Sequence, residues 1–293
     1  MNTYPKLNPA KDEAALISRV TDFVDSFDKK NGKLSIPKSP GGQLDFFGYR
    51  DLSFDFDFKT PFVSIKEFLD FSADVSGSGG IYVFGGALRD LAMFGVSGFT
   101  SDIDVVVDRS WDVLEPALIK RKAIKNKFGG LRLYVGKMPI DIWNSENTWA
   151  FKQGYLKYRG IHSLLETTIL NWDSILMDWK KKRLICDPTY FSEIRNRRLD
   201  VVFEENPNRL GMLLRVLRHL HQKDAKKISL RACRYLAKET VNFSFEELRN
   251  AEIRSYKSAI IELKLYDFFR FEQFKEYSED LAVSDILHPA PFV

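Results

Sequence analysis

Hydrophobic residues recur along this chain with two periods, one typical of helices and one typical of strands. Apolar residues every three or four positions over 11–28 predict an amphipathic helix, and a shorter run of the same kind at 65–69 predicts another. Strict alternation of apolar and polar residues at 52–58 predicts a strand with one buried face. Glycines and prolines between 31 and 42 break these patterns and predict a loop.

The middle of the chain alternates between the two periods, and the last third is helical. The elements expected in the middle are strand 81–84, helix 86–94, strand 103–107, helix 111–119 and two strands near 131–135 and 138–143. From about Pro207 onward the pattern is helical, with one stripe formed by Leu210, Leu213, Leu214, Leu217 and Leu220. We therefore predict an α+β fold in three parts. These are an N-terminal extension (1–75, a helix plus a strand that packs on the head), a head with a small mixed β-sheet (76–200) and a mainly helical neck and body (201–293).

Two aspartates stand at positions i and i+2 at the start of the strand 103–107. Successive side chains of a strand point to opposite faces, so Asp102 and Asp104 share one face and can hold divalent metal ions. Asp55 and Asp57 have the same spacing, but no glycine turn or helix precedes them. We interpret that second pair as the solvated face of an amphipathic strand.

A Gly-Gly pair stands between the strand 81–84 and the following helix. Gly85 and Gly86 offer backbone N–H groups and a positive helix end to a phosphate chain. Arg89 lies in the first turn, where the helix dipole disfavours a cation, so we expect a bound polyphosphate to supply the compensating charge. Asp90 is expected to cap the helix locally or to orient Arg89. A metal site beside a triphosphate site predicts nucleotidyl transfer.

Two metal ions about 4 Å apart clamp the attacking and leaving oxygens in phosphoryl chemistry, and they usually need a third carboxylate. Asp141 in KMPIDIWN is the best candidate, because a strand that pairs with 103–107 brings it alongside. We expect two Mg²⁺ ions at Asp102, Asp104 and Asp141, with Mn²⁺ as a possible substitute. Asp108, at the end of the strand, is interpreted as a turn or cap residue.

Composition narrows the class of protein. Hydrophobic residues make up 44% of the 293 residues and aromatic residues 14%, which argues against disorder. Two scattered cysteines and four histidines give neither a disulfide framework nor the ligand spacing of a structural zinc site. The N-terminus lacks the apolar core of a signal peptide, and no apolar run is long enough to span a membrane. We expect a soluble, cytoplasmic protein.

The segment FGGALRDLAMFGVSGFTSDIDVVV resembles the head of the polymerase-β-type nucleotidyltransferases. Among these it is most similar to class II CCA-adding enzymes and bacterial poly(A) polymerases, whose signature is Gly-Gly, then Arg-Asp, then Asp-x-Asp. The resemblance extends over roughly residues 80–222. It implies a metal-dependent enzyme that takes a nucleoside triphosphate, and IDIWNSEN resembles the segment that carries the third carboxylate, here Asp141.

The same resemblance implies further nucleotide-binding residues. EENPNRLGMLLRVLR is similar to the helix in which a Glu-Asp-x-x-Arg motif reads the incoming base, which assigns that role to Glu205, Asn206 and Arg209. Arg218, with Arg215, matches the arginine-rich part of that helix, and Asn171 matches the asparagine of the flexible loop.

Two departures from the family pattern set a limit to the resemblance. Glu166 and Thr167 stand where the family has Arg-Asp before this asparagine, and Asn206 replaces the base-reading aspartate. Asparagine both donates and accepts hydrogen bonds, whereas aspartate only accepts them, so we do not extend the resemblance to CCA addition.

Basic residues cluster in KRKAIKNK (120–127) and WKKKR (179–183), although such runs are usually solvated turns. Lysine and arginine supply most non-specific affinity for nucleic acids, so an RNA acceptor such as tRNA or a tRNA-like molecule is expected. Tyr155 and Tyr158 are candidates to stack on a base, with core packing as the alternative. Two other functions stay open: a toxin- or defence-type transferase that modifies tRNA or a protein, and a non-catalytic RNA-binding relict.

Overall fold

The computed structural model describes residues 6–29, 62–126, 128–222 and 225–287. The predicted loop at 31–42 and the predicted strand at 52–58, with Asp55 and Asp57, lie outside these residues.

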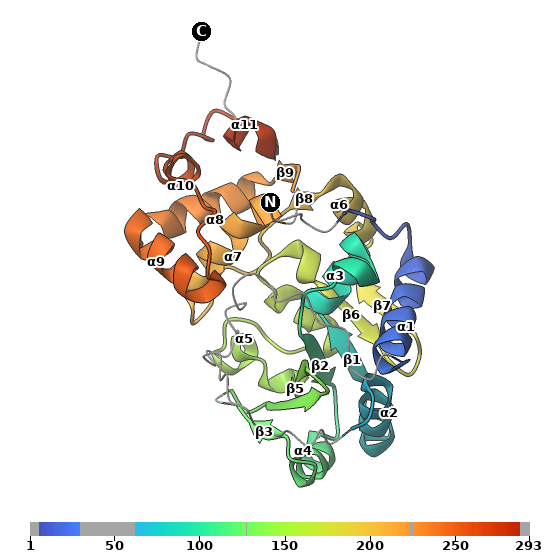
Figure 1. Ribbon diagram of the computed structural model, residues 1–293. Helices are drawn as coiled ribbons and strands as arrows, with labels where there is room; N and C mark the ends of the chain where they lie inside the picture. The colour runs from blue at the N-terminus through green and yellow to red at the C-terminus, as the bar shows by residue number, and fades with distance from the viewer. Residues whose placement is uncertain (1–5, 30–61, 127, 223–224, 288–293) are drawn as a thin grey trace.

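A seven-stranded mixed sheet forms the centre of the molecule, in the order β3-β4-β5-β2-β1-β6-β7 (Figure 1). β2 and β5 run parallel, and the other neighbouring pairs run antiparallel. A smaller sheet has the order β10-β9-β8. The strands are β1 (Ile81–Phe84), β2 (Ile103–Val107), β3 (Ile124–Lys125), β4 (Leu131–Val135), β5 (Met138–Asn144), β6 (Ile175–Asp178), β7 (Arg183–Cys186), β8 (Arg198–Leu199), β9 (Lys227–Ile228) and β10 (Leu281–Ala282).

The helices precede, interrupt and follow the sheet, and the later ones gather at one end of the molecule, away from α4 (Figure 1). They are α1 (Glu13–Lys29), α2 (Ile65–Ser76), α3 (Gly86–Phe94), α4 (Trp111–Lys120), α5 (Trp149–Lys152), α6 (Tyr190–Asn196), α7 (Arg209–Gln222), α8 (Leu230–Thr240), α9 (Phe245–Tyr256), α10 (Leu263–Arg270) and α11 (Val283–Leu287). This arrangement confirms the predicted α+β class. Among these described helices, none combines the length and the apolar character that crossing a bilayer demands.

Most predicted elements in the described residues are confirmed to within a residue or two at each end. α2 is longer than expected, because its buried positions continue at helical spacing to Ser76 before Gly77 ends the helix. β6 was not predicted. All four of its residues are buried, so it lacks the alternation that identifies a half-exposed strand.

The N-terminal helix supports the element that follows the Gly-Gly pair. α1 contacts α3, and Arg19 donates from Nη1 to the carbonyl oxygens of Leu91 and Ala92 at 3.0 and 3.3 Å. These carbonyls lie in the last turn of α3, where a cation is favourable. One hydrophobic cluster includes side chains from α1 through α11. The division of the chain at residues 75 and 200 stays a prediction.

The two faces of the sheet have different roles. Val105 and Val107 of β2 point into the main core, which α1 to α4 help to form. On the opposite face, Val106 joins a second apolar cluster that also contains Tyr82 and Phe84. Asp104 shares the face of Val106, since residues two apart in a strand do. The fold therefore places the predicted carboxylates on the face that the main core leaves available.

Candidate active site

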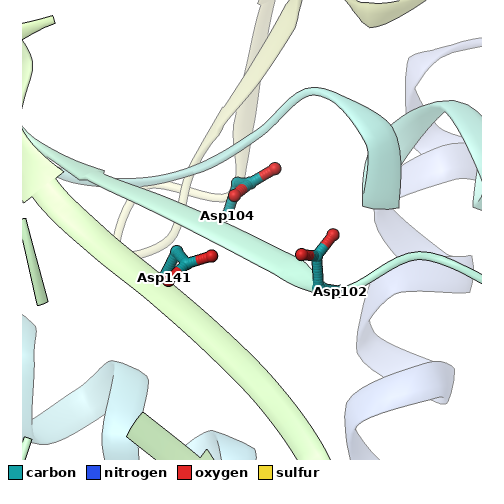
Figure 2. A group of neighbouring side chains, drawn as sticks. All are labelled: Asp102, Asp104 and Asp141. Carbon is teal, nitrogen blue, oxygen red and sulfur yellow. The ribbon is translucent and has the colours of Figure 1, made fainter. Parts of the chain in front are cut away.

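Three carboxylates converge where β2 lies beside β5. Asp104 is the register partner of Asp141 in the parallel β2–β5 pair, and Asp102 precedes Asp104 by two residues on the same face. One oxygen from each of the three lies within 4.8 Å of those of the other two. Figure 2 shows Asp104 on β2, Asp102 just before the start of that strand and Asp141 on the neighbouring strand. The expected meeting of these three residues is thus observed.

The donor set suits a hard divalent cation. Carboxylate oxygens are the ligands that Mg²⁺ prefers, and here three of them come from β5, from β2 and from the residue just before β2. Burial, followed by the charges of Asp102 and Asp141, raises the pKa of Asp104 well above its usual value, while Arg215 and Arg132 act in the opposite direction. A site that gathers this much negative charge in a partly desolvated place fits a divalent ion between the carboxylates.

Arg132 on β4 is a site residue that the sequence analysis missed. It is the register partner of Asp141 across the β4–β5 hairpin, and its Nε donates to Asp141 Oδ1 at 2.8 Å. Its Nη2 donates to Asp141 Oδ2 and lies 3.8 Å from Asp102 Oδ2. A signal was present: with Gly136 and Lys137 as a two-residue turn, hairpin pairing puts Arg132 directly opposite Asp141.

The glycine turn lies beside the carboxylates because of strand register. Phe84, the last residue of β1, pairs with Asp104, so Gly85 comes one residue beyond the row of acidic side chains. Gly85 has φ +67° and ψ −123°, a conformation that only glycine adopts readily. α3 begins at Gly86, and the first N–H groups of a helix have no partners within it.

Asp90 ties the helix after this turn to the loop before Asp102. Its Oδ2 accepts hydrogen bonds from Thr100 N at 3.2 Å, Thr100 Oγ1 at 2.9 Å and Ser101 Oγ at 3.1 Å. Its Oδ1 accepts from Arg89 Nε at 3.0 Å, so the expectation that Asp90 orients Arg89 agrees with the geometry. Asp90 thereby holds in place the segment that leads into Asp102 and Asp104.

Arg89 has a different environment from the one expected. Its side chain is only 2% exposed, and Nη1 donates to Asp173 Oδ1 at 2.5 Å. Together with Asp90, this carboxylate balances the charge of the arginine from within the protein. The compensating negative charge is therefore supplied by Asp90 and Asp173, and the prediction that a bound polyphosphate supplies it is wrong.

Asp173 also connects the site to the C-terminal helices. Its Oδ2 accepts from Arg215 Nη2 of α7 at 2.8 Å, and Arg215 lowers the pKa of Asp104 through its charge. Arg218, one turn further along α7, points elsewhere: it is buried, pairs with Glu252 and has its Cζ 4.0 Å from the centre of the Tyr256 ring. Of the two arginines, Arg215 is the one beside the carboxylates.

Asn171 is held by protein groups. Its Nδ2 donates to Glu193 Oε2 and to the carbonyl oxygen of Arg198, both at 3.0 Å, and its Oδ1 accepts from Asp200 N at 2.9 Å. These bonds join the turn before β6 to β8. The arrangement gives Asn171 a role in positioning this turn.

Residues 205–209 form the entry to α7. Glu205 is exposed and lies 3.9 Å from Lys238, while Asn206 Oδ1 accepts from Asn208 N at 2.8 Å. Asn208 in turn caps the helix through Gly211 N. Arg209, also exposed, pairs with Glu239 of α8. The role of this segment in reading a base stays a prediction.

The two candidate stacking tyrosines are in different surroundings. Tyr158 donates to Asp108 Oδ1 at 2.5 Å and lies 2.8 Å from Ser145 Oγ, so it is a structural residue. Asp108 thus accepts a hydrogen bond from a residue 50 positions away, and its role as a turn or cap residue stays a prediction. Tyr155 is 52% exposed and stacks on Trp149 with ring centres 5.2 Å apart. Of these two, Tyr155 is the tyrosine with a face near solvent.

No protein-family model matches the chain, and no curated protein matches it by sequence. Among solved structures, the chain resembles the Thermotoga maritima CCA-adding enzyme complexed with tRNA, with 20% identity over 77% of this chain and a TM-score of 0.49. It also resembles a tRNA-processing enzyme in an apo form, with 15% identity over 78% of this chain and a TM-score of 0.49. The chain spans 52% and 60% of these two structures. CCA-adding enzymes and tRNA-processing enzymes are thus among the solved structures to which this chain is similar.

Proposed function

We propose that this protein is a nucleotidyltransferase that moves a nucleoside monophosphate from a nucleoside triphosphate to a hydroxyl group at an RNA 3′ end, in tRNA or a tRNA-like molecule. The observation that carries the proposal is the meeting of Asp102, Asp104 and Asp141 next to the Gly85 turn. Carboxylates that hold metal and a helix start that accepts phosphate are the two parts that this reaction needs.

In this proposal Asp102, Asp104 and Asp141 hold two Mg²⁺ ions, for which Mn²⁺ is a substitute. Such ions supply the positive charge that activates the attacking hydroxyl and neutralises the departing pyrophosphate. Gly86 and the residues after it present their N–H groups to the triphosphate at the start of α3. Asp90 and Arg89 keep that turn and the aspartate loop in a fixed relative position.

The acceptor is proposed to be RNA because the chain carries two basic stretches. Some side chains of these stretches make contacts within the protein. Arg121 lies over the ring of Phe71, with Cζ 3.8 Å from its centre, and Lys125 pairs with Glu115 at 2.9 Å. Lys182 lies over Trp179, while Lys180 is exposed.

The test is to incubate the protein with Mg²⁺, total RNA and each of the four labelled nucleoside triphosphates in turn. We expect label in small RNA with one or two of the nucleotides, and none with the Asp104→Ala variant. Label in protein instead of RNA would favour the toxin- or defence-type transferase. Absence of any transfer by folded protein would favour the non-catalytic relict and contradict the proposal.

Replacing Asn206 by aspartate is expected to change which nucleotide is used. The Oδ1 acceptor that holds Asn208 N is retained in the variant, so the helix entry stays intact, while the Nδ2 donor is lost. A hydrogen bond to a base edge is worth about 1–3 kcal/mol, so the ratio of kcat/KM between nucleotides should shift about tenfold or more. Steady-state kinetics with ATP, CTP, GTP and UTP measure this. An unchanged nucleotide profile in Asn206→Asp and in Arg209→Ala would mean that residues 205–209 only start the helix.

A further inference from the structure

An arginine stands inside the carboxylate cluster. Arg132, Asp141 and Asp104 form one row across β4, β5 and β2, because they are register partners in both strand pairs. All three side chains therefore project from the same face of the sheet. The guanidinium binds both oxygens of Asp141, through Nε and Nη2, in the two-pronged geometry that makes arginine–carboxylate pairs strong.

Arg132 lies where it would compete with a metal ion for the carboxylates. Asp141 is 1% exposed and Arg132 is 13% exposed, so water screens their interaction little. The same Nη2 lies 3.8 Å from Asp102 Oδ2, which places one cationic group next to two of the three candidate metal ligands. A guanidinium and a divalent cation that approach the same carboxylates repel each other and compete for the same lone pairs.

We propose that Arg132 is an internal counter-cation that regulates metal binding: it neutralises Asp141 and competes with a divalent ion for the carboxylates, so that the protein binds the ion weakly on its own. This inference rests on the proposed function, because it takes the three carboxylates to be the metal ligands. It goes beyond that function by assigning to the site a resident competitor that lowers its affinity for the ion.

Replacing Arg132 should therefore raise the affinity of the protein for a divalent cation. Removing the positive charge leaves three carboxylates with no arginine among them, so their attraction for a divalent cation increases. If Arg132 instead serves only to orient Asp141 as a ligand, its removal leaves that carboxylate misplaced and weakens metal binding. The two roles predict opposite signs for the change in affinity.

The experiment is a titration of the whole, nucleotide-free protein with Mn²⁺, in which electron paramagnetic resonance measures the free ion. We expect Arg132→Leu to bind Mn²⁺ at least about tenfold more tightly than the wild type, given the strength of an interaction between charges a few ångströms apart. Arg132→Lys should fall between them, because it keeps the charge and loses the two-pronged contact. Arg132→Gln gives the same comparison if the leucine variant does not fold.

Two controls test whether the change in Mn²⁺ affinity arises at the carboxylate cluster. Arg109→Leu removes an arginine that is 77% exposed and 3.7 Å from Asp108, and it should leave Mn²⁺ affinity unchanged. Adding Asp141→Asn to Arg132→Leu should abolish the gain. An affinity in Arg132→Leu that is equal to or weaker than that of the wild type overturns the inference. Because the titration contains neither nucleotide nor acceptor, its outcome is independent of whether nucleotidyl transfer is observed.

Discussion

Replacing Asp104 by alanine is expected to abolish nucleotidyl transfer while the protein stays folded. Asp104 is the middle residue of the cluster, between Asp102, which precedes it by two residues, and Asp141 on the next strand. Its loss removes a ligand shared by the proposed metal site, which should lower kcat by roughly three orders of magnitude or more. Labelled nucleotide incorporation into RNA measures the effect, and Asp102→Ala should behave in the same way.

Stability should move in the opposite direction to activity. The pKa of Asp104 is raised by burial and by its two acidic neighbours, so its ionised form disfavours the folded state at neutral pH. Asp104→Ala removes that repulsion, and the Tm of the metal-free protein should be unchanged or higher. A variant that unfolds would show that the loss of activity comes from structure.

The matched control is the other Asp-x-Asp pair. Asp55 and Asp57 stand two residues apart, as Asp102 and Asp104 do. The substitutions Asp55→Ala and Asp57→Ala should leave turnover nearly unchanged. If these two substitutions abolish transfer in folded protein, or if Asp102→Ala together with Asp104→Ala retains it, the wrong pair has been assigned to the metal.

Replacing Arg89 by alanine is expected to destabilise the protein strongly. The arginine is buried between Asp90 and Asp173, and its removal takes away the guanidinium that these two interior carboxylates share, while Asp173 keeps its contact with Arg215. Breaking a buried pair in this way costs about 3–5 kcal/mol in the free energy of unfolding. For a chain of this size the Tm should fall by roughly 10 °C, which thermal melting followed by circular dichroism measures.

Arg109→Ala is the control for this prediction. Arg109 is 77% exposed, and its removal should change the free energy of unfolding by less than about 0.5 kcal/mol. If Arg89→Ala keeps the Tm of the wild type and raises the KM for the nucleotide, the arginine contacts phosphate directly.

Much of the site could be predicted from local patterns. The i, i+2 spacing put Asp102 and Asp104 on one face, and the apolar runs around them predicted strands at 103–107 and 138–143. Asp141 could be placed beside this pair because neighbouring strands of one sheet bring side chains of the same face together. The spacing of residues within one element determines where a side chain points, and that information is local.

Tertiary structure decided which charged groups that lie far apart in the sequence meet. Arg89 is 84 residues away from Asp173, and no local signal relates them. Arg215 and Arg218 are on the same helix, yet one reaches Asp173 and the other is buried against Glu252. The sequence marks each as an arginine on a helix, but its partner depends on which element packs opposite it. Burial removes the water that would otherwise solvate a charge, so the folded chain must supply a counter-charge from wherever its packing brings one.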